Sequence, residues 1–284
     1  MTPPLFSLCQ RNSTLGGVEM TVGDRLMTGS DNGWKLIWNE DFEGPDIDLS
    51  RWDYDIGGHG WGNNERQYYT KEARNAYIKD SKLIIKAIQE EYEGSPYTSA
   101  KLVTRGKADW LYGRFEIRAK LPSGQGIWPA FWMLPTDPQL YGNWPSSGEI
   151  DMMEMVGKEP NRVHGTLHMG NPHIYKGGSF ALAEGNFADH FHIFTLDWTP
   201  EQIRWYIDGE LYHKSSEWYS RETEFAEPTP YPAPFNQPFY LMLNLAVGGY
   251  WPGSPDESTV LPQMLEVDYI RIYQPEDGKY GPAI

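Results

Sequence analysis

Three acidic residues lie within six positions of one apolar stretch, which reads GEIDMMEMVG over residues 148–157. Glu149, Asp151 and Glu154 stand among Ile, Met and Val residues of the kind that fill the core of a strand. Burying carboxylates there is unfavourable unless they are paired, hydrogen-bonded or used in a reaction. The stretch is therefore the first candidate for a functional site.

The spacing of the three residues indicates how a strand would present them. Side chains alternate between the two faces of a strand, so Glu149 and Asp151 share a face and Glu154 would lie on the opposite one. One extra residue at Met152–Met153, accommodated as a β-bulge, brings Glu154 back to the same face. Bulges are common beside active sites, and the spacing therefore predicts three carboxyls in one cleft.

Three carboxyls on one face cannot all ionise cheaply. Like charge and burial raise the pKa of at least one of them, which leaves a carboxylate and a protonated acid together near neutral pH. That pair is what the cleavage of a glycosidic bond requires. The alternatives are a Ca²⁺ or Mg²⁺ site or an acidic surface patch, but the stretch lacks the loop and backbone carbonyls of such cation sites. The pattern favours catalysis.

Aromatic and amide side chains suited to sugar surround this stretch in the sequence. Trp128 and Trp132 share a strand face, where a sugar platform and an ordinary core position are equally compatible with the pattern. Two Gly-rich loops, 59–69 and 244–256, carry further Trp and Asn residues, and exposed loops often bind ligands. His164 and His168 share a strand face, and we expect His168 to contact sugar rather than a metal.

Short runs of alternating apolar and polar residues recur from residue 33 onwards. In RFEIRAKL (114–121) the four apolar residues occupy one face. Asp208-Gly209 predicts a type I′ hairpin turn. No stretch shows a long helical period. We expect one antiparallel all-β domain over residues 33–284, a sandwich or jelly roll, preceded by an N-terminal arm over residues 1–32.

Composition excludes several classes of function. The formal net charge of −15 repels phosphate backbones, so we expect no nucleic-acid partner. No apolar run approaches the roughly 18 residues of a membrane span. Cys9 is the single cysteine, which rules out an intramolecular disulfide. The N-terminus shows no signal peptide, so the protein stays inside the cell or a signal has been removed.

The motifs together resemble glycoside hydrolase family 16. GEIDMMEMVG is similar to the family's active-site motif in its bulged E-x-D-x-x-E form. Five other segments resemble the laminarinase, or endo-β-1,3-glucanase, branch: GWGNNERQYYT, PSGQGIWPAFWML, VHGTLH, LMLNLAVGGYWPGSPD and VDYIRIY. The resemblance implies a concanavalin A-like β-jelly roll of two curved antiparallel sheets, with a substrate cleft on the concave face. It also implies endo-acting, retaining hydrolysis of β-1,3-glucosidic bonds.

The resemblance assigns roles to individual residues. Glu149 would be the nucleophile, Glu154 the general acid/base, and Asp151 the residue that orients Glu149. The cleft would be lined by Asn63, Trp128, Trp132, His168, Trp251 and Gln263. No cofactor is needed for catalysis, but a structural Ca²⁺ would bind the Asp268 side chain and backbone carbonyls near Asp41 and Ser81. The expected partner is a β-glucan polysaccharide, and we expect a secreted monomer.

Other functions on the same scaffold remain open at this point. They are a mixed-linkage β-1,3-1,4-glucanase, a transglycosylase and a non-catalytic β-glucan recognition protein. The bulged motif argues against the first, because lichenase-type enzymes usually carry E-x-D-x-E. The three acidic residues argue against the last, since recognition proteins typically lack them. One departure concerns YTSAKL (97–102), where Lys101 stands in place of an arginine that contacts sugar in similar enzymes.

Overall fold

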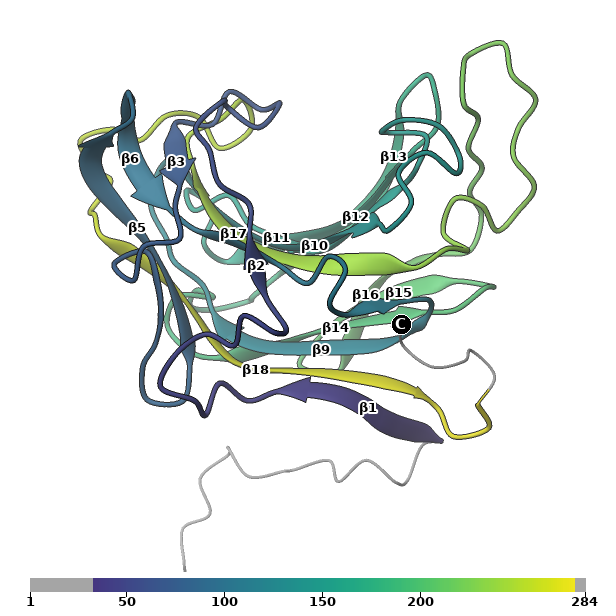
Figure 1. The fold of residues 1–284 in the computed structure, drawn as a ribbon, viewed down its shortest axis with the longest axis horizontal. Coiled ribbons are helices and arrows are strands. Elements are labelled where there is room, and N and C mark those ends of the chain that lie inside the picture. The colour runs from purple at the N-terminus through teal and green to yellow at the C-terminus, as the bar shows by residue number, and fades with distance from the viewer. Residues whose placement is uncertain (1–32, 279–284) are drawn as a thin grey trace, which may run out of the picture.

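The computed structural model describes residues 33–278, so the N-terminal arm expected over residues 1–32 lies outside the described part. Every regular element among residues 33–278 is a strand, as the sequence predicts. The strands form two sheets packed face to face (Figure 1). No helix long and apolar enough to cross a bilayer occurs in this part of the chain.

Ten strands form the outer sheet. Its path runs through β16 (Glu210–Ser215), β15 (Ile203–Ile207), β14 (His192–Trp198), β9 (Gly113–Lys120), β18 (Gln263–Pro275), β5 (Leu83–Tyr92), β6 (Ser95–Ser99) and β3 (Gln67–Tyr69). Off this path, β18 also pairs with β1 (Trp34–Glu40) and β5 with β4 (Ala76–Ile78). All pairs are antiparallel except that of β3 with β6, which is parallel.

Eight strands form the inner sheet. They follow the order β13 (Ile174–Ala181), β12 (Arg162–Met169), β11 (Glu149–Glu154), β10 (Ile127–Pro135), β17 (Phe239–Val247), β7 (Lys101–Val103) and β2 (Asp53–Tyr54), and β8 (Asp109–Trp110) pairs with β17. The acidic stretch is thus a central strand, flanked by β10 and β12.

The core lies between the two sheets. On β9, Phe115, Ile117 and Ala119 are fully buried while the residues between them are half-buried, which confirms the predicted alternation. Asp208 and Gly209 join β15 to β16 with φ angles of 50° and 84°, as a type I′ turn requires. The two sheets are held together by the burial of apolar side chains on the faces that they turn towards each other.

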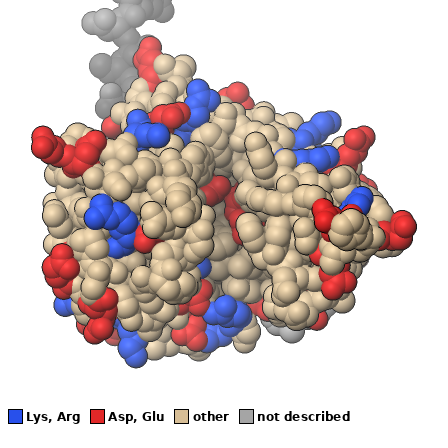
Figure 2. All heavy atoms as spheres, turned by 90° about the horizontal axis from the view of Figure 1, so that it is seen from above, with Lys and Arg blue, Asp and Glu red and all other residues tan. Residues whose placement is uncertain are grey.

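The inner sheet is curved, and its concave face is open. In Figure 1 β12 and β13 rise on one side of this face, and β3, β5 and β6 rise on the other. Figure 2 looks onto this face and shows a groove between two lobes, with acidic atoms at its centre. The fold therefore places β11 at the floor of a groove.

Candidate active site

The bulge predicted in β11 is present. Asp151 pairs with Trp132 of β10, and Met153 pairs with Phe131, the residue just before Trp132. Met152 therefore has no partner in the ladder between β10 and β11. On the other side the register with β12 shifts between Asp151 and Glu154. Met152 and Met153 are both buried in the core. As a result Glu149, Asp151 and Glu154 all line the same cleft, which confirms the prediction.

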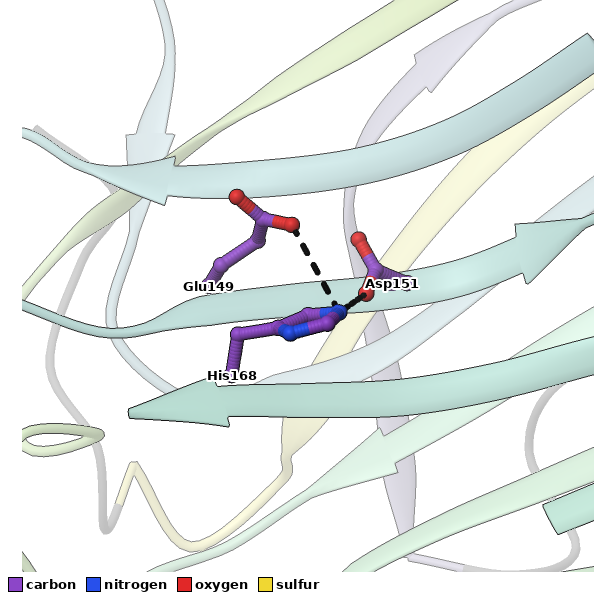
Figure 3. A group of neighbouring side chains, drawn as sticks. All are labelled: Glu149, Asp151 and His168. Carbon is purple, nitrogen blue, oxygen red and sulfur yellow. Dashed lines mark ion pairs between the residues drawn. The ribbon is translucent and has the colours of Figure 1, made fainter. Parts of the chain in front are cut away.

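His168 of β12 lies against two of the carboxyls (Figure 3). It is the ladder partner of Glu149. Its Nε2 atom is 3.1 Å from Oδ2 of Asp151 and 3.9 Å from Oε1 of Glu149. The contact with Asp151 has the length of an ion pair but not the alignment of a hydrogen bond. The side chain of Asp151 is only 3% exposed, so this contact lies away from water.

Two tryptophan indoles donate hydrogen bonds to the two glutamates. Nε1 of Trp144 donates to Oε2 of Glu149 over 2.8 Å, and Nε1 of Trp128 donates to Oε1 of Glu154 over 3.2 Å. Each bond favours the ionised form of the carboxyl that accepts it. The glutamates therefore have separate partners at the two ends of the acidic strand.

Burial shifts all three carboxyls towards the protonated form. Burial, followed by the charge of Asp151, raises the pKa of Glu149 to about 8. Burial also raises the pKa of Asp151 to about 8, and a hydrogen bond with Glu149 lets the two share a proton. The pKa of Glu154 is raised well above its usual value by burial and by the charges of Asp151 and Glu149. Carboxyls that share protons in this way are suited to acid-base chemistry.

The cleft around these residues has a volume of about 990 Å³. Its lining includes five of the six predicted sugar-contact residues: Asn63, Trp128, Trp132, His168 and Trp251. The rings of Trp128 and Trp251 meet edge to face, with centroids 5.7 Å apart. Aromatic faces together with amide and carboxyl groups form a surface that suits a chain of sugar rings.

Gln263 does not line this cleft. It begins β18 in the outer sheet, where its Oε1 accepts from the backbone nitrogen of Ser123 over 3.1 Å and its Nε2 donates to the carbonyl of Val260 over 2.8 Å. Both polar ends of the amide are thus bound to backbone. The expected sugar contact is not supported by this placement.

Several lining residues were not singled out as site residues from the sequence. Trp144 lies five positions before Glu149, and this proximity was the available signal. Three others, Asn244, Tyr69 and Glu65, form a polar network along the cleft, in which Trp132 donates to Asn244, Asn244 to Tyr69, and Tyr69 to Glu65. Glu65 also accepts from Asn63 over 3.4 Å and from Gln67 over 2.6 Å. Its members come from segments far apart in sequence.

Within residues 33–278, one group of three potential metal ligands stands out. Glu149, Asp151 and His168 each offer an atom within 4.8 Å of the others. Ca²⁺ takes about six to eight oxygen ligands, whereas this group offers two carboxyls and an imidazole. The group therefore does not suit Ca²⁺.

The residues expected to hold Ca²⁺ belong to another part of the fold, where β1 and β5 meet one edge of β18. β1 and β5 both pair with this edge, β1 ending with Glu40 opposite Ile270 and β5 beginning with Leu83 opposite Val267. Asp268 lies between those partners, at a bulge relative to β9. Asp41 follows the last residue of β1, and Ser81 comes two residues before β5. In this structure the Asp268 carboxylate accepts a hydrogen bond from Arg118.

Comparison with known proteins agrees with this geometry. Residues 63–271 match the family model described as glycosyl hydrolases family 16. A β-glucanase from Rhodothermus marinus is 48% identical over 275 residues, covering 92% of each chain. A glucan endo-1,3-β-glucosidase from Cryptopygus antarcticus is 39% identical and covers 84% of this chain and 91% of its own.

A solved structure shows the same architecture. The laminarinase from Rhodothermus marinus superposes with a TM-score of 0.76 at 46% identity, covering 85% of this chain and 97% of the other. This likeness confirms the jelly-roll sandwich expected from the sequence. With a family match over most of the chain and relatives of this identity, the chain belongs to glycosyl hydrolase family 16.

Proposed function

We propose that the protein is an endo-acting, retaining hydrolase of β-1,3-glucosidic bonds in laminarin-type β-glucans. The observation that carries the proposal is the single cleft face shared by Glu149, Asp151 and Glu154 beneath aromatic walls. The names of the similar proteins, a laminarinase and a glucan endo-1,3-β-glucosidase, support the substrate. A groove that runs between two lobes (Figure 2) suits attack within a long chain.

The reaction takes two steps. In the first, Glu154 gives its proton to the glycosidic oxygen while the Glu149 carboxylate attacks C1. The C1–oxygen bond breaks, the leaving sugar departs as an alcohol, and the remaining sugar is covalently held by Glu149. In the second, Glu154 takes a proton from a water molecule that attacks C1, which releases Glu149 and restores the proton on Glu154. Two inversions at C1 give net retention.

The neighbouring residues support these roles. Glu149 must be ionised to attack, and Asp151 can take the proton that the two share. The Trp144 indole and the nearby His168 ring then favour the negative form of Glu149. Glu154, whose pKa is raised by burial and by both neighbouring charges, is the carboxyl that keeps its proton. The environment thus separates an attacking carboxylate from a proton donor.

Product analysis on several polysaccharides tests the substrate assignment. Laminarin should yield a ladder of short oligosaccharides, as an endo-acting enzyme requires. Lichenan, agarose and xyloglucan run in parallel distinguish a mixed-linkage glucanase or a transglycosylase. Cleavage of agarose with none of laminarin would overturn the proposal. Binding of laminarin without any cleavage would instead indicate a recognition protein.

We further propose a structural Ca²⁺ at the edge of β18, held by the Asp268 carboxylate and backbone carbonyls near Asp41 and Ser81. Support comes from the convergence of two strand ends on the bulge at Asp268, which offers carbonyls beside a carboxylate. Ca²⁺ favours such oxygen ligands. Arg118 would have to release the carboxylate for the ion to bind. The ion would stabilise the fold and take no part in the reaction.

A further inference from the structure

Lys101 is buried between two tryptophan rings at one side of the cleft. It belongs to β7 of the inner sheet and is only 5% exposed. Its Nζ atom lies 4.6 Å from the centre of the Trp61 ring and 4.5 Å from that of Trp132. Both distances are within the range of cation–π attraction, which is stronger where water is excluded. One ammonium thus joins a loop residue to a residue of the sheet.

The two indoles are already held by their N–H groups. Trp132 donates to Oδ1 of Asn244 over 2.6 Å, and Trp61 donates to the carbonyl of Gly57 over 3.1 Å. Trp61 also has a φ of 48°, a left-handed conformation that a bulky residue rarely adopts without support. Because both N–H groups are occupied, each indole can contact a ligand only with the surface of its ring. Lys101 lies next to both of these rings.

The charge of Lys101 is balanced within the protein. Its Nζ atom lies 3.5 Å from Oδ2 of Asp55, and Oδ1 of the same carboxylate accepts a hydrogen bond from Arg105 over 2.5 Å. Burial lowers the pKa of Lys101, and the charges of Asp55 and Glu65 oppose that shift. A cation so enclosed has little surface left for a sugar hydroxyl.

Strand register shows where this cluster lies relative to the carboxyls. Glu154 pairs with Ala130, Ala130 with Asn244, and Asn244 with Lys101, across four neighbouring strands. Three strand spacings of about 4.8 Å place the Lys101 backbone about 14 Å from that of Glu154. Sugar bound beside Trp61 is therefore remote from the bond that is cleaved, whereas Trp132 pairs directly with Asp151.

We propose that Lys101 is a positioning residue that holds the Trp61 ring in place beside Trp132 and so extends the aromatic wall from Trp132, next to Asp151, towards the part of the glucan chain remote from the cleaved bond. The inference rests on the proposed function for its substrate. Because Lys101 acts through the two rings, its loss should weaken binding in the ground state and the transition state alike. That raises KM and leaves kcat nearly unchanged.

The kinetic test compares Lys101→Met, Lys101→Arg and the control Lys35→Met, which removes an exposed lysine from β1 in the other sheet. With laminarin, Lys101→Met should raise KM about tenfold and change kcat less than twofold. Lys101→Arg should restore most of the affinity, because arginine also stacks on aromatic faces. The loss should grow with oligosaccharide length, since short substrates do not reach Trp61. An unchanged KM, or an equal loss on every length, would overturn the proposal.

A double-mutant cycle shows whether Lys101 acts through the ring. In a Trp61→Ala background the ring that Lys101 holds is already gone, so adding Lys101→Met should change KM less than twofold. A full tenfold effect in that background would mean that Lys101 contacts sugar directly, and the proposal would be wrong.

A measurement without substrate separates this proposal from the proposed function. Acrylamide quenching of tryptophan fluorescence should increase in Lys101→Met, remain at the native level in Lys35→Met, and return towards it in Lys101→Arg. Near-ultraviolet circular dichroism provides the check that each variant is folded, and Lys101→Gln replaces any methionine variant that is not. Unchanged quenching in a folded variant contradicts this role of Lys101 even if laminarin proves not to be the substrate.

Discussion

Trp144 donates its indole hydrogen to Oε2 of Glu149 over 2.8 Å. The donor comes from the loop before β11, and its residue is 53% exposed, whereas the carboxyl that accepts is largely buried. The bond favours the ionised form of Glu149 and so opposes the effect of burial on its pKa. The ring of Trp144 also packs near His168 and His173.

Replacing Trp144 with phenylalanine removes the donor and keeps an aromatic ring. Without the bond the pKa of Glu149 should rise further. The proposed nucleophile works in its ionised form, so activity should be lost as pH falls through that pKa. We therefore expect the acid limb of kcat/KM to move to higher pH, by up to about one unit, with the alkaline limb in place. Rates measured from pH 4 to 10 check this, and an acid limb at the wild-type pH would contradict it.

The roles of the two glutamates can be separated with azide. The Glu154→Ala variant is given an aryl β-glucoside whose leaving group needs no acid. It should form the covalent intermediate and then stall. Added azide should attack this intermediate and release the β-glucosyl azide. Glu149→Ala lacks the nucleophile, so azide should attack directly and give the α-azide with inversion. Nuclear magnetic resonance of the products identifies the anomer. The opposite pattern would reverse the assignment. Both variants should lose about 10²-fold or more in laminarin turnover.

Met152 is the residue of the bulge without a ladder partner, and its deletion tests the bulge. The shortened strand alternates regularly, so the glutamate that follows still faces the cleft. Its reach and angle change, and a displacement of about 1 Å can lower a rate roughly 10²-fold. We expect a folded and much slower enzyme, judged by circular dichroism and laminarin turnover. The control Met152→Leu keeps the chain length and should retain most activity. Full activity of the deletion variant would show that the extra residue does not position the acid.

The buried carboxyls should make the protein less stable as pH rises. The pKa of Glu154 is raised in the folded state, and the pKa values of Glu149 and Asp151 reach about 8, so the folded state binds more protons than the unfolded state between about pH 4 and pH 8. Stability falls across that window as pH increases.

An amide in place of one carboxyl removes part of this effect. Glu154→Gln should melt a few degrees above the wild type at pH 8, and the difference should shrink towards pH 4, where the carboxyls are protonated in both states. Calorimetry at several pH values measures this. Glu184→Gln, which alters an exposed carboxyl, serves as the control and should melt like the wild type. A Glu154→Gln variant less stable than the wild type at pH 8 would refute the argument.

Removal of Ca²⁺ tests the site proposed at Asp268. An ion that binds only the folded state stabilises it by mass action. Chelation with EDTA should lower the melting temperature by several degrees and leave laminarin turnover at low temperature largely intact. Asp268→Asn should melt near the chelated wild type and respond little to EDTA. Elemental analysis without calcium, together with no thermal shift, would exclude the site.

Local patterns in the sequence were sufficient to predict the shape of the acidic strand. Alternation depends only on neighbouring residues, so the spacing of Glu149, Asp151 and Glu154 by itself predicted a shared face and a bulge, and the register of β11 confirms both. The alternation of β9 and the turn at Asp208-Gly209 were predicted for the same reason.

The partners of these residues were decided by tertiary structure. Trp144 reaches Glu149 through the path of a loop. Lys101 meets Trp132 only because β7, β17 and β10 lie side by side, and it meets Trp61 because the loop before β3 folds over that part of the sheet. The amide of Gln263 is bound to backbone for a similar reason, since β18 begins beside the backbone of Ser123. The period of the apolar residues in the sequence predicts which face of its own strand a side chain lies on. Which strands become neighbours depends on how the whole chain buries its apolar surface, and that determines what each side chain contacts.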